Sequence, residues 1–121
     1  MNNSPIENKI GCVFIPVSDM RQAVEWYSRL LGQPVETISH EGQIYDLPMR
    51  GALGVILDSH KPVINSSQPI CFFWIDELHQ TRSFLAENNV EIVREIEDVR
   101  SVLTLTLRDP DGNLLTVCQR K

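Results

Sequence analysis

The feature that most limits how this chain can fold is an internal repeat. An apolar, partly β-branched run, a helical pattern and a series of short apolar runs occur in that order, and the same order then occurs again. The first set covers about residues 9–59 and the second about 69–120, with a turn-rich connector at about 60–68. A long period with only two copies is not that of a solenoid. It predicts two β-α-β-β-β units that close around a shared concave sheet within a single domain, 1–121.

The helical segment of the first unit is marked at both ends. Between residues 20 and 31, apolar residues recur at steps of three and four, which is the period of a helix that buries one face. Asp19 precedes this segment and can accept hydrogen bonds from its first free amides. Gly32, followed by Pro34, is typical of a helix end.

The second unit carries a similar helical pattern. We expect Asp76 to cap this helix and Asn88-Asn89 to end it. Its apolar positions are Leu78, Thr81, Phe84 and Leu85.

The remaining apolar runs predict strands, which together with the two helices indicate an α+β fold. In the first unit they cover residues 10–17, 35–38, 44–47 and 53–57, and in the second 70–75, 91–94, 102–108 and 113–119. The last two strands are joined by Asp109-Pro110-Asp111-Gly112, a strong turn sequence.

Composition excludes several classes of protein. With 42% hydrophobic and 22% charged residues, the chain has the make-up of a globular domain and not of a disordered one. No apolar stretch approaches the roughly 20 residues of a membrane span, and the first residues are polar, so we expect no membrane partner and a cytoplasmic location. Three cysteines without C-x-x-C spacing favour reduced thiols over disulfides or a zinc site.

The charge of the chain bears on its partners. The formal net charge is -5, and Lys and Arg are dispersed along the sequence. Nucleic acids and anionic lipids require a basic surface, so neither is an expected partner. A neutral or cationic small molecule suits this charge better.

Two motifs resemble the vicinal oxygen chelate superfamily, which includes glyoxalase I, extradiol dioxygenases, fosfomycin resistance enzymes and bleomycin resistance proteins. The first is the run 14–20 (FIPVSDM) leading into Trp26-Tyr27 and Leu30-Leu31-Gly32, and the second is the run 108–113 (RDPDGN). The resemblance implies an open sheet whose concave face holds the ligand, with helices behind it. It also implies a homodimer whose sites are completed at the subunit interface.

In metal-dependent members of that superfamily, four strands each supply one ligand. The resemblance places these positions at Cys12, Leu57, Ile70 and Thr116. Leucine and isoleucine carry no donor atom and threonine is a poor ligand, so we expect no metal and no other cofactor. The alternative is a divalent metal ion held elsewhere, by Asp58 and His60 or by His40 and Glu41.

Strand alternation places further residues beside those positions. If Cys12, Ile70 and Thr116 face the cavity, then residues two or four positions away face it too, namely Phe14, Phe72, Trp74, Leu114 and Cys118. The aromatic rings suit a planar or cationic ligand, although such residues also serve in cores and dimer contacts. Tyr45, Asp46 and Arg108 are candidates for polar contacts at the cavity edge.

Three functions follow from these observations. The first is a small-molecule-binding protein that needs no metal and resembles the bleomycin resistance proteins, which sequester a drug between two subunits. The second is a divalent-metal lyase or dioxygenase. The third is an interaction or regulatory module without an open pocket. No nucleophile elbow, glycine-rich phosphate loop or Cys-His pairing is evident, so binding is favoured over catalysis.

Overall fold

The structure is a computed structural model that describes residues 4–36 and 42–121. The first unit contains β1 (Cys12–Pro16), α1 (Met20–Leu31), β2 (Ile44–Asp46) and β3 (Gly54–Asp58). The second contains β4 (Phe72–Ile75), α2 (Leu78–Glu87), β5 (Glu91–Val99), β6 (Val102–Arg108) and β7 (Leu114–Arg120). The predicted α+β class is confirmed.

The strands of the described residues form two sheets with related connectivity, neither of which closes into a barrel. Their orders are β1-β3-β2 and β4-β7-β6-β5. In each sheet the first strand of the unit pairs in parallel with the last, and the last pairs antiparallel with the strand before it. Of the strand predicted at 35–38, Val35 and Glu36 lie outside any strand, and residues 37 and 38 lie outside the described residues.

Helix α1 has the predicted boundaries because both caps form. The Asp19 carboxylate accepts a hydrogen bond from the Gln22 amide at 3.1 Å. At the other end Gly32 adopts the left-handed conformation, with φ +64°, and its N–H donates to the carbonyl of Arg29.

Helix α2 is capped by a different residue from the one that we expected. Glu77, not Asp76, is the N-cap, and its carboxylate accepts from the Gln80 amide at 2.7 Å. A cap side chain binds the amide two or three residues further on, and Asp76 lies one residue too early for a helix that begins at Leu78. The Leu78 amide donates to the Gln119 side chain at 2.7 Å, which attaches the helix start to β7.

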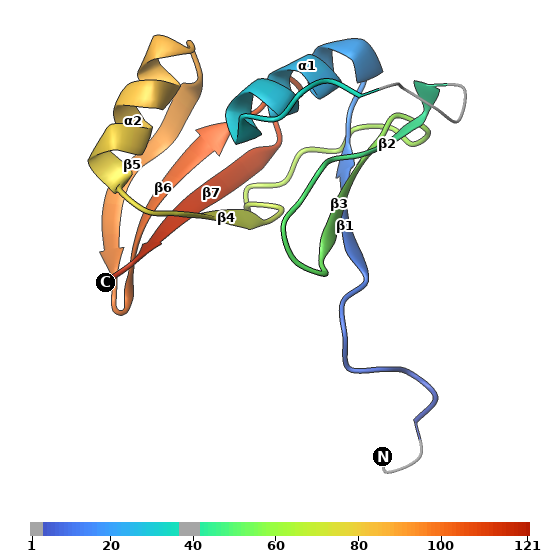
Figure 1. Ribbon diagram of the computed structural model, residues 1–121, viewed down its shortest axis with the longest axis horizontal. Coiled ribbons are helices and arrows are strands. Elements are labelled where there is room, and N and C mark those ends of the chain that lie inside the picture. Colours follow the sequence, from blue (N-terminus) through green and yellow to red (C-terminus); the bar gives the residue numbers. More distant parts are fainter. Residues whose placement is uncertain (1–3, 37–41) are drawn as a thin grey trace.

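Both units contribute to one hydrophobic core. Figure 1 shows α1 and α2 on the same, upper side of the molecule, while the N-terminal segment extends away from it. The strand residues that alternate with the predicted cavity-facing ones lie in this core or against it: Val13, Ile15, Cys71, Phe73, Leu115 and Val117. No helix within the described ranges is long and apolar enough to cross a membrane.

The two sequence motifs meet in space and hold the units together. The Tyr27 hydroxyl, in α1, donates to the carboxylate of Asp109 at 2.6 Å, and the Asn113 side chain donates to the carbonyl of Pro16 at 2.8 Å. The side chain of Ser18 contacts that of Asp111 as well. Burial, followed by the nearby Asp109 carboxylate, raises the pKa of Tyr27, so the phenol stays protonated and donates.

The turn after β6 requires glycine at its last position. Gly112 has φ +88°, and a Cβ atom there would lie 2.8 Å from the side-chain oxygen of Asn65. The Asn65 amide donates to the carbonyl of Asp111 at 3.1 Å. The connector between the units is therefore tied to the same turn that binds the first unit.

Candidate functional site

On the sheet faces opposite the core, aromatic side chains are exposed. The strand register pairs Phe14 with Ile56, Phe72 with Thr116 and Trp74 with Cys118. Phe14 is 56% exposed, and Phe72 and Trp74 are each 49% exposed. Adjacent exposed aromatic side chains such as Phe72 and Trp74 are typical of binding surfaces.

The other predicted site residues on these faces are less accessible. Cys12 and Thr116 are half-buried. Cys118 pairs with Trp74 but is only 5% exposed, and Leu114 is as deeply buried. Ile70 precedes β4 and packs against the core.

Leu57 and Tyr45 lie on the opposite, core-facing side of their sheet. Leu57 is fully buried and pairs with both Ile15 and Tyr45. The Tyr45 hydroxyl accepts from the Glu36 amide at 2.9 Å. Strand β3 alternates so that Ile56 and Asp58, in place of Leu57, share the face of Phe14.

Arg108 is the last residue of β6, just before the turn that leads to β7. Its guanidinium forms an ion pair with Glu91 at 3.2 Å and donates to the Gly112 carbonyl at 3.4 Å. It lines a polar cavity of about 510 Å³ beside that turn, and neither Phe72 nor Trp74 is among the described residues that line this cavity. The structure therefore does not bring Arg108 to the exposed aromatic side chains.

The exposed aromatic residues of β4 border an apolar cavity of about 470 Å³. Its other wall is the loop between β2 and β3, and its floor includes Val13 and Val55. A second cavity, of about 340 Å³, shares Met49, Arg50, Phe73 and Trp74 with the first, so the two adjoin. We call this pair of cavities the Trp74 hollow.

Sequence reasoning missed one wall of the Trp74 hollow. Residues 48–51 were interpreted only as a turn between two predicted strands, the second of which began at Leu53, because a short polar-apolar mixture with Pro and Gly carries no period. The lining residues from this loop are Pro48, Met49, Arg50, Gly51, Ala52 and Leu53. The signal that pointed to the other wall was the alternation of Phe72 and Trp74 along one strand.

The environment of Trp74 is aromatic and positively charged. The rings of Phe72 and Trp74 meet edge to face, with centroids 4.8 Å apart. The guanidinium carbon of Arg120 lies 3.7 Å from the centroid of the Trp74 ring, within the range of a cation–π contact.

Two other hollows on the described surface are weaker candidates. On the face of the first sheet, Phe14, Asp58 and Ile64 line a cavity of about 290 Å³. The Asp58 carboxylate accepts from the backbone amide of His60 at 2.7 Å, so it is already engaged in a local turn.

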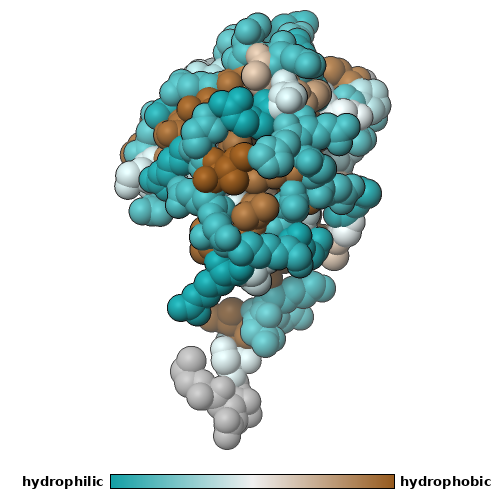
Figure 2. Space-filling model, turned by 90° about the vertical axis from the view of Figure 1, so that its left-hand side faces the viewer, coloured by the Kyte–Doolittle hydropathy of each residue, from teal (hydrophilic) through white to brown (hydrophobic). Residues whose placement is uncertain are grey.

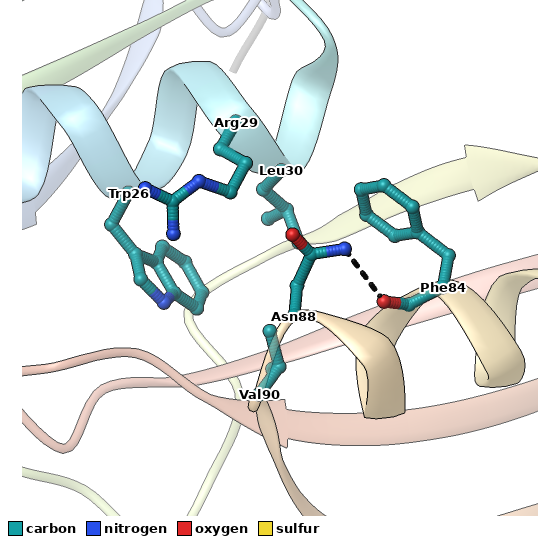
Figure 3. Close-up of a pocket in the computed structure, with 6 residues that line it drawn as sticks. All are labelled: Trp26, Arg29, Leu30, Phe84, Asn88 and Val90. Carbon is teal, nitrogen blue, oxygen red and sulfur yellow. Dashed lines mark hydrogen bonds between the residues drawn. The ribbon is translucent and has the colours of Figure 1, made fainter.

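The second hollow is a groove between the helices. The side of the molecule that carries α2 and β5 shows only small apolar patches among hydrophilic side chains (Figure 2). The groove between α1 and α2, lined by Trp26, Arg29, Leu30, Phe84, Asn88 and Val90, is drawn in Figure 3. Its volume of about 10 Å³ holds at most a water molecule.

The residues at the four metal-ligand positions do not fit a divalent ion. Leu57 points into the core and, like Ile70, has no donor atom. Nowhere in residues 4–36 and 42–121 do three or more His, Cys, Asp or Glu side chains come together as a metal would require. Of the alternative donors, His40 and Glu41 lie outside the described residues.

The cysteine side chains near the exposed faces are ordinary thiols. Burial raises the pKa of the Cys71 thiol to about 11 and also raises the pKa of Cys118. A thiol becomes a strong nucleophile when its pKa is lowered, so neither of these two residues is prepared for covalent catalysis.

Comparisons with known proteins identify the family to which this fold belongs. A family model for the Glyoxalase/Bleomycin resistance protein/Dioxygenase superfamily matches residues 9–117, and the chain belongs to this superfamily. No curated protein sequence matches it. The predicted resemblance is thereby confirmed at the level of family and fold.

Solved structures with the same fold differ in their described activities. TnmS3, an antibiotic binding protein from Streptomyces sp. CB03234, has a TM-score of 0.75 at 17% identity, covering 98% of this chain and 100% of its own. A glyoxalase/dioxygenase from Nostoc punctiforme has a TM-score of 0.74 at 16% identity, covering 98% of each chain. Lactoylglutathione lyase from Agrobacterium tumefaciens has a TM-score of 0.70 at 15% identity, covering 96% of each chain.

Proposed function

We propose that this protein binds a planar aromatic small molecule in the Trp74 hollow, without a metal ion, and sequesters it. The observation that carries the proposal is that Trp74 and Phe72, each half exposed, border an apolar cavity of about 470 Å³. Ligand sites are typically apolar hollows of this size with a few polar groups. TnmS3, described as an antibiotic binding protein, has the same fold.

Stacking supplies the physical basis for this preference. The indole of Trp74 presents a large flat surface at low conformational cost, and Phe72 holds it edge to face. Covering these two rings and the apolar loop wall with a planar ligand removes apolar area from water on both partners. Of the two kinds of ligand favoured by the sequence, aromatic and cationic, this geometry supports the aromatic one.

Binding without turnover suits the chemistry of the hollow. Among the residues that the structure describes, its lining includes no His, Asp or Glu, and the one cysteine there, Cys71, has a raised pKa. General acid–base and nucleophilic catalysis need such groups in an activated state. We therefore propose that the chain acts as a binding protein and not as a lyase or dioxygenase.

The proposed working form is a cytoplasmic homodimer. Phe14 on the first sheet and Phe72 on the second are exposed on faces that a second copy could cover. An aromatic ligand enclosed between such faces would lose more water contact than on one face alone. The net charge of -5 supports a small molecule over nucleic acid as the partner.

Calorimetry with naphthalene-2-carboxamide, a neutral planar probe, tests the proposal. Trp74→Ala should weaken binding by about tenfold, since one aromatic stacking contact contributes on the order of 1 kcal/mol. Phe84→Ala, which removes an exposed ring from α2, is the matched control and should leave binding unchanged. Unchanged affinity in folded Trp74→Ala would refute the site.

The same titration after dialysis against EDTA tests metal independence. We expect the same affinity and no stoichiometric metal in protein purified without a His-tag. A loss of binding that added divalent ions restore would favour the metal-dependent alternative.

A further inference from the structure

The charges around the Trp74 hollow are opposite in sign to the net charge of the protein. The chain carries a formal charge of -5, yet Arg50 is the sole charged residue among those that line the hollow in the described part of the chain. A second guanidinium, that of Arg120, lies on the Trp74 ring. Local charge of this sign attracts anions.

We propose that the Trp74 hollow recognises aromatic acids, and that Arg50 binds their anionic group. This inference rests on the proposed function and names the substrate class of the same site. A planar ring stacks on Trp74 while a carboxylate attached to it reaches the guanidinium of Arg50.

Arg50 has the position and the freedom that this role needs. It lines both cavities of the hollow, on the loop opposite Trp74. Its side chain is exposed, and it forms no ion pair within the described residues. A planar guanidinium matches a carboxylate with two parallel hydrogen bonds, which gives orientation as well as affinity.

Arg120 makes the hollow unfavourable for cations. It follows Cys118, the partner of Trp74, by two residues on β7, and so lies on the same face as the indole. With its guanidinium carbon 3.7 Å from the ring centroid, it already occupies a cation–π position. A cationic ligand would meet repulsion there, whereas an anionic ligand would be attracted.

The free edge of β4 adds hydrogen-bond donors. The Cys71 carbonyl accepts from the Thr116 amide at 3.1 Å, so in this parallel pair Phe72 and Trp74 direct their backbone groups to the other side. That side is the hollow, because consecutive β4 residues line it and no β7 residue does. The N–H groups of Phe72 and Trp74 are thus placed to bind an acceptor oxygen.

The test compares, by isothermal titration calorimetry, three probes that share a naphthalene ring and differ in the charge of the attached group. They are naphthalene-2-carboxylate, naphthalene-2-carboxamide and 2-naphthylmethylammonium. We expect the carboxylate to bind roughly tenfold more tightly than the carboxamide, as for one charge-assisted contact, and the ammonium most weakly. The preference for the carboxylate should decrease as sodium chloride is added, because salt screens it.

Substitutions assign the preference to a residue. Arg50→Gln should abolish the preference by lowering the affinity for the carboxylate to that for the carboxamide, and Arg50→Lys should retain part of it. Arg120→Gln should increase the affinity for the ammonium. Arg21→Gln, which removes the same charge from the exposed side of α1, is the control and should change nothing.

The possible outcomes separate this inference from the proposed function. Equal binding of the three probes, or tightest binding of the ammonium, would refute the inference and leave the binding function standing. A carboxylate preference that survives Arg50→Gln would refute the role of Arg50. If none of the probes binds, the proposed function fails together with the inference.

Discussion

Among individual residues, Asp109 is a buried carboxylate whose oxygens accept hydrogen bonds from several groups of the fold. Its oxygens accept four hydrogen bonds, from the Tyr27 hydroxyl, from the amides of Asp111 and Asn113, and from the Asn113 side chain. A buried charge is tolerated when it is satisfied in this way. Its role is to join the units, and it offers no acceptor to a ligand.

Removal of one of these donors should lower stability measurably. Tyr27→Phe should reduce the free energy of unfolding by about 1–3 kcal/mol, since it deletes a hydrogen bond to a buried carboxylate. Urea denaturation followed by circular dichroism gives the value. Tyr45→Phe removes a buried hydroxyl bound to the amide of exposed Glu36 and serves as the control. A loss no greater than in the control would contradict the importance of the Tyr27–Asp109 contact.

At the scale of helices and strands, sequence periodicity was sufficient where one face is buried. It predicted α1 and the alternation of β4, because buried and exposed side chains differ in polarity there. Strand β5 was predicted at 91–94 but extends over Glu91–Val99. Its side chains are largely exposed at the sheet edge, where Glu95 and Asp98 pair with Arg82 and Lys121, so it shows little apolar pattern.

The site was predictable only in part, for a related reason. Alternation placed Phe72 and Trp74 on an open face, but it could not show that residues 48–53 form the facing wall, since this depends on tertiary structure. Leu57 was assigned to the cavity through the family resemblance, but it lies on the core-facing side of its strand. An apolar run such as 53–57 has no polar alternation that could have revealed this. The side chain that faces outward there is Ile56.

The cap of α2 gives a prediction at this scale. Glu77→Ala should lower the free energy of unfolding by about 0.5–1 kcal/mol, because the Gln80 amide loses its acceptor. Asp76→Ala, one residue earlier, should change it by less than about 0.5 kcal/mol, as for an exposed residue without such a contact. Thermal or urea unfolding of the two variants shows which residue caps α2. A larger loss of stability in Asp76→Ala than in Glu77→Ala would contradict the assignment of Glu77 as the cap.

For the whole molecule, buried ionisable groups predict how stability depends on pH. The pKa of Cys71 is raised from 9.0 to about 11, and those of Cys118 and Tyr27 are raised too. Above about pH 9 the unfolded chain loses these protons while the folded chain retains them, so the free energy of unfolding falls as pH rises toward 11. Below pH 9 these groups add no pH dependence.

Urea midpoints measured between pH 8 and pH 11 test this expectation. Cys71→Ala should weaken the fall of the free energy of unfolding with pH, because one of the groups that ionise at different pH in the folded and unfolded chains is gone. The variant should nevertheless be less stable than the wild-type protein at every pH, since it loses buried side-chain volume. A wild-type protein whose midpoint stays constant across this range would contradict the effect of burial on these groups.

The contact between the two motifs has a consequence for what sequence searches can report. Tyr27 and Asp109, which lie in the motifs that reveal the family, form a hydrogen bond that joins the two units. The surfaces that we propose to meet a ligand are elsewhere, on β4 and the loop 48–53. A contact that joins the units can be shared by family members with unrelated chemistry. Recognition of the family by its motifs therefore identifies the fold, whereas the ligand has to be inferred from the loop 48–53 and the edge of β4.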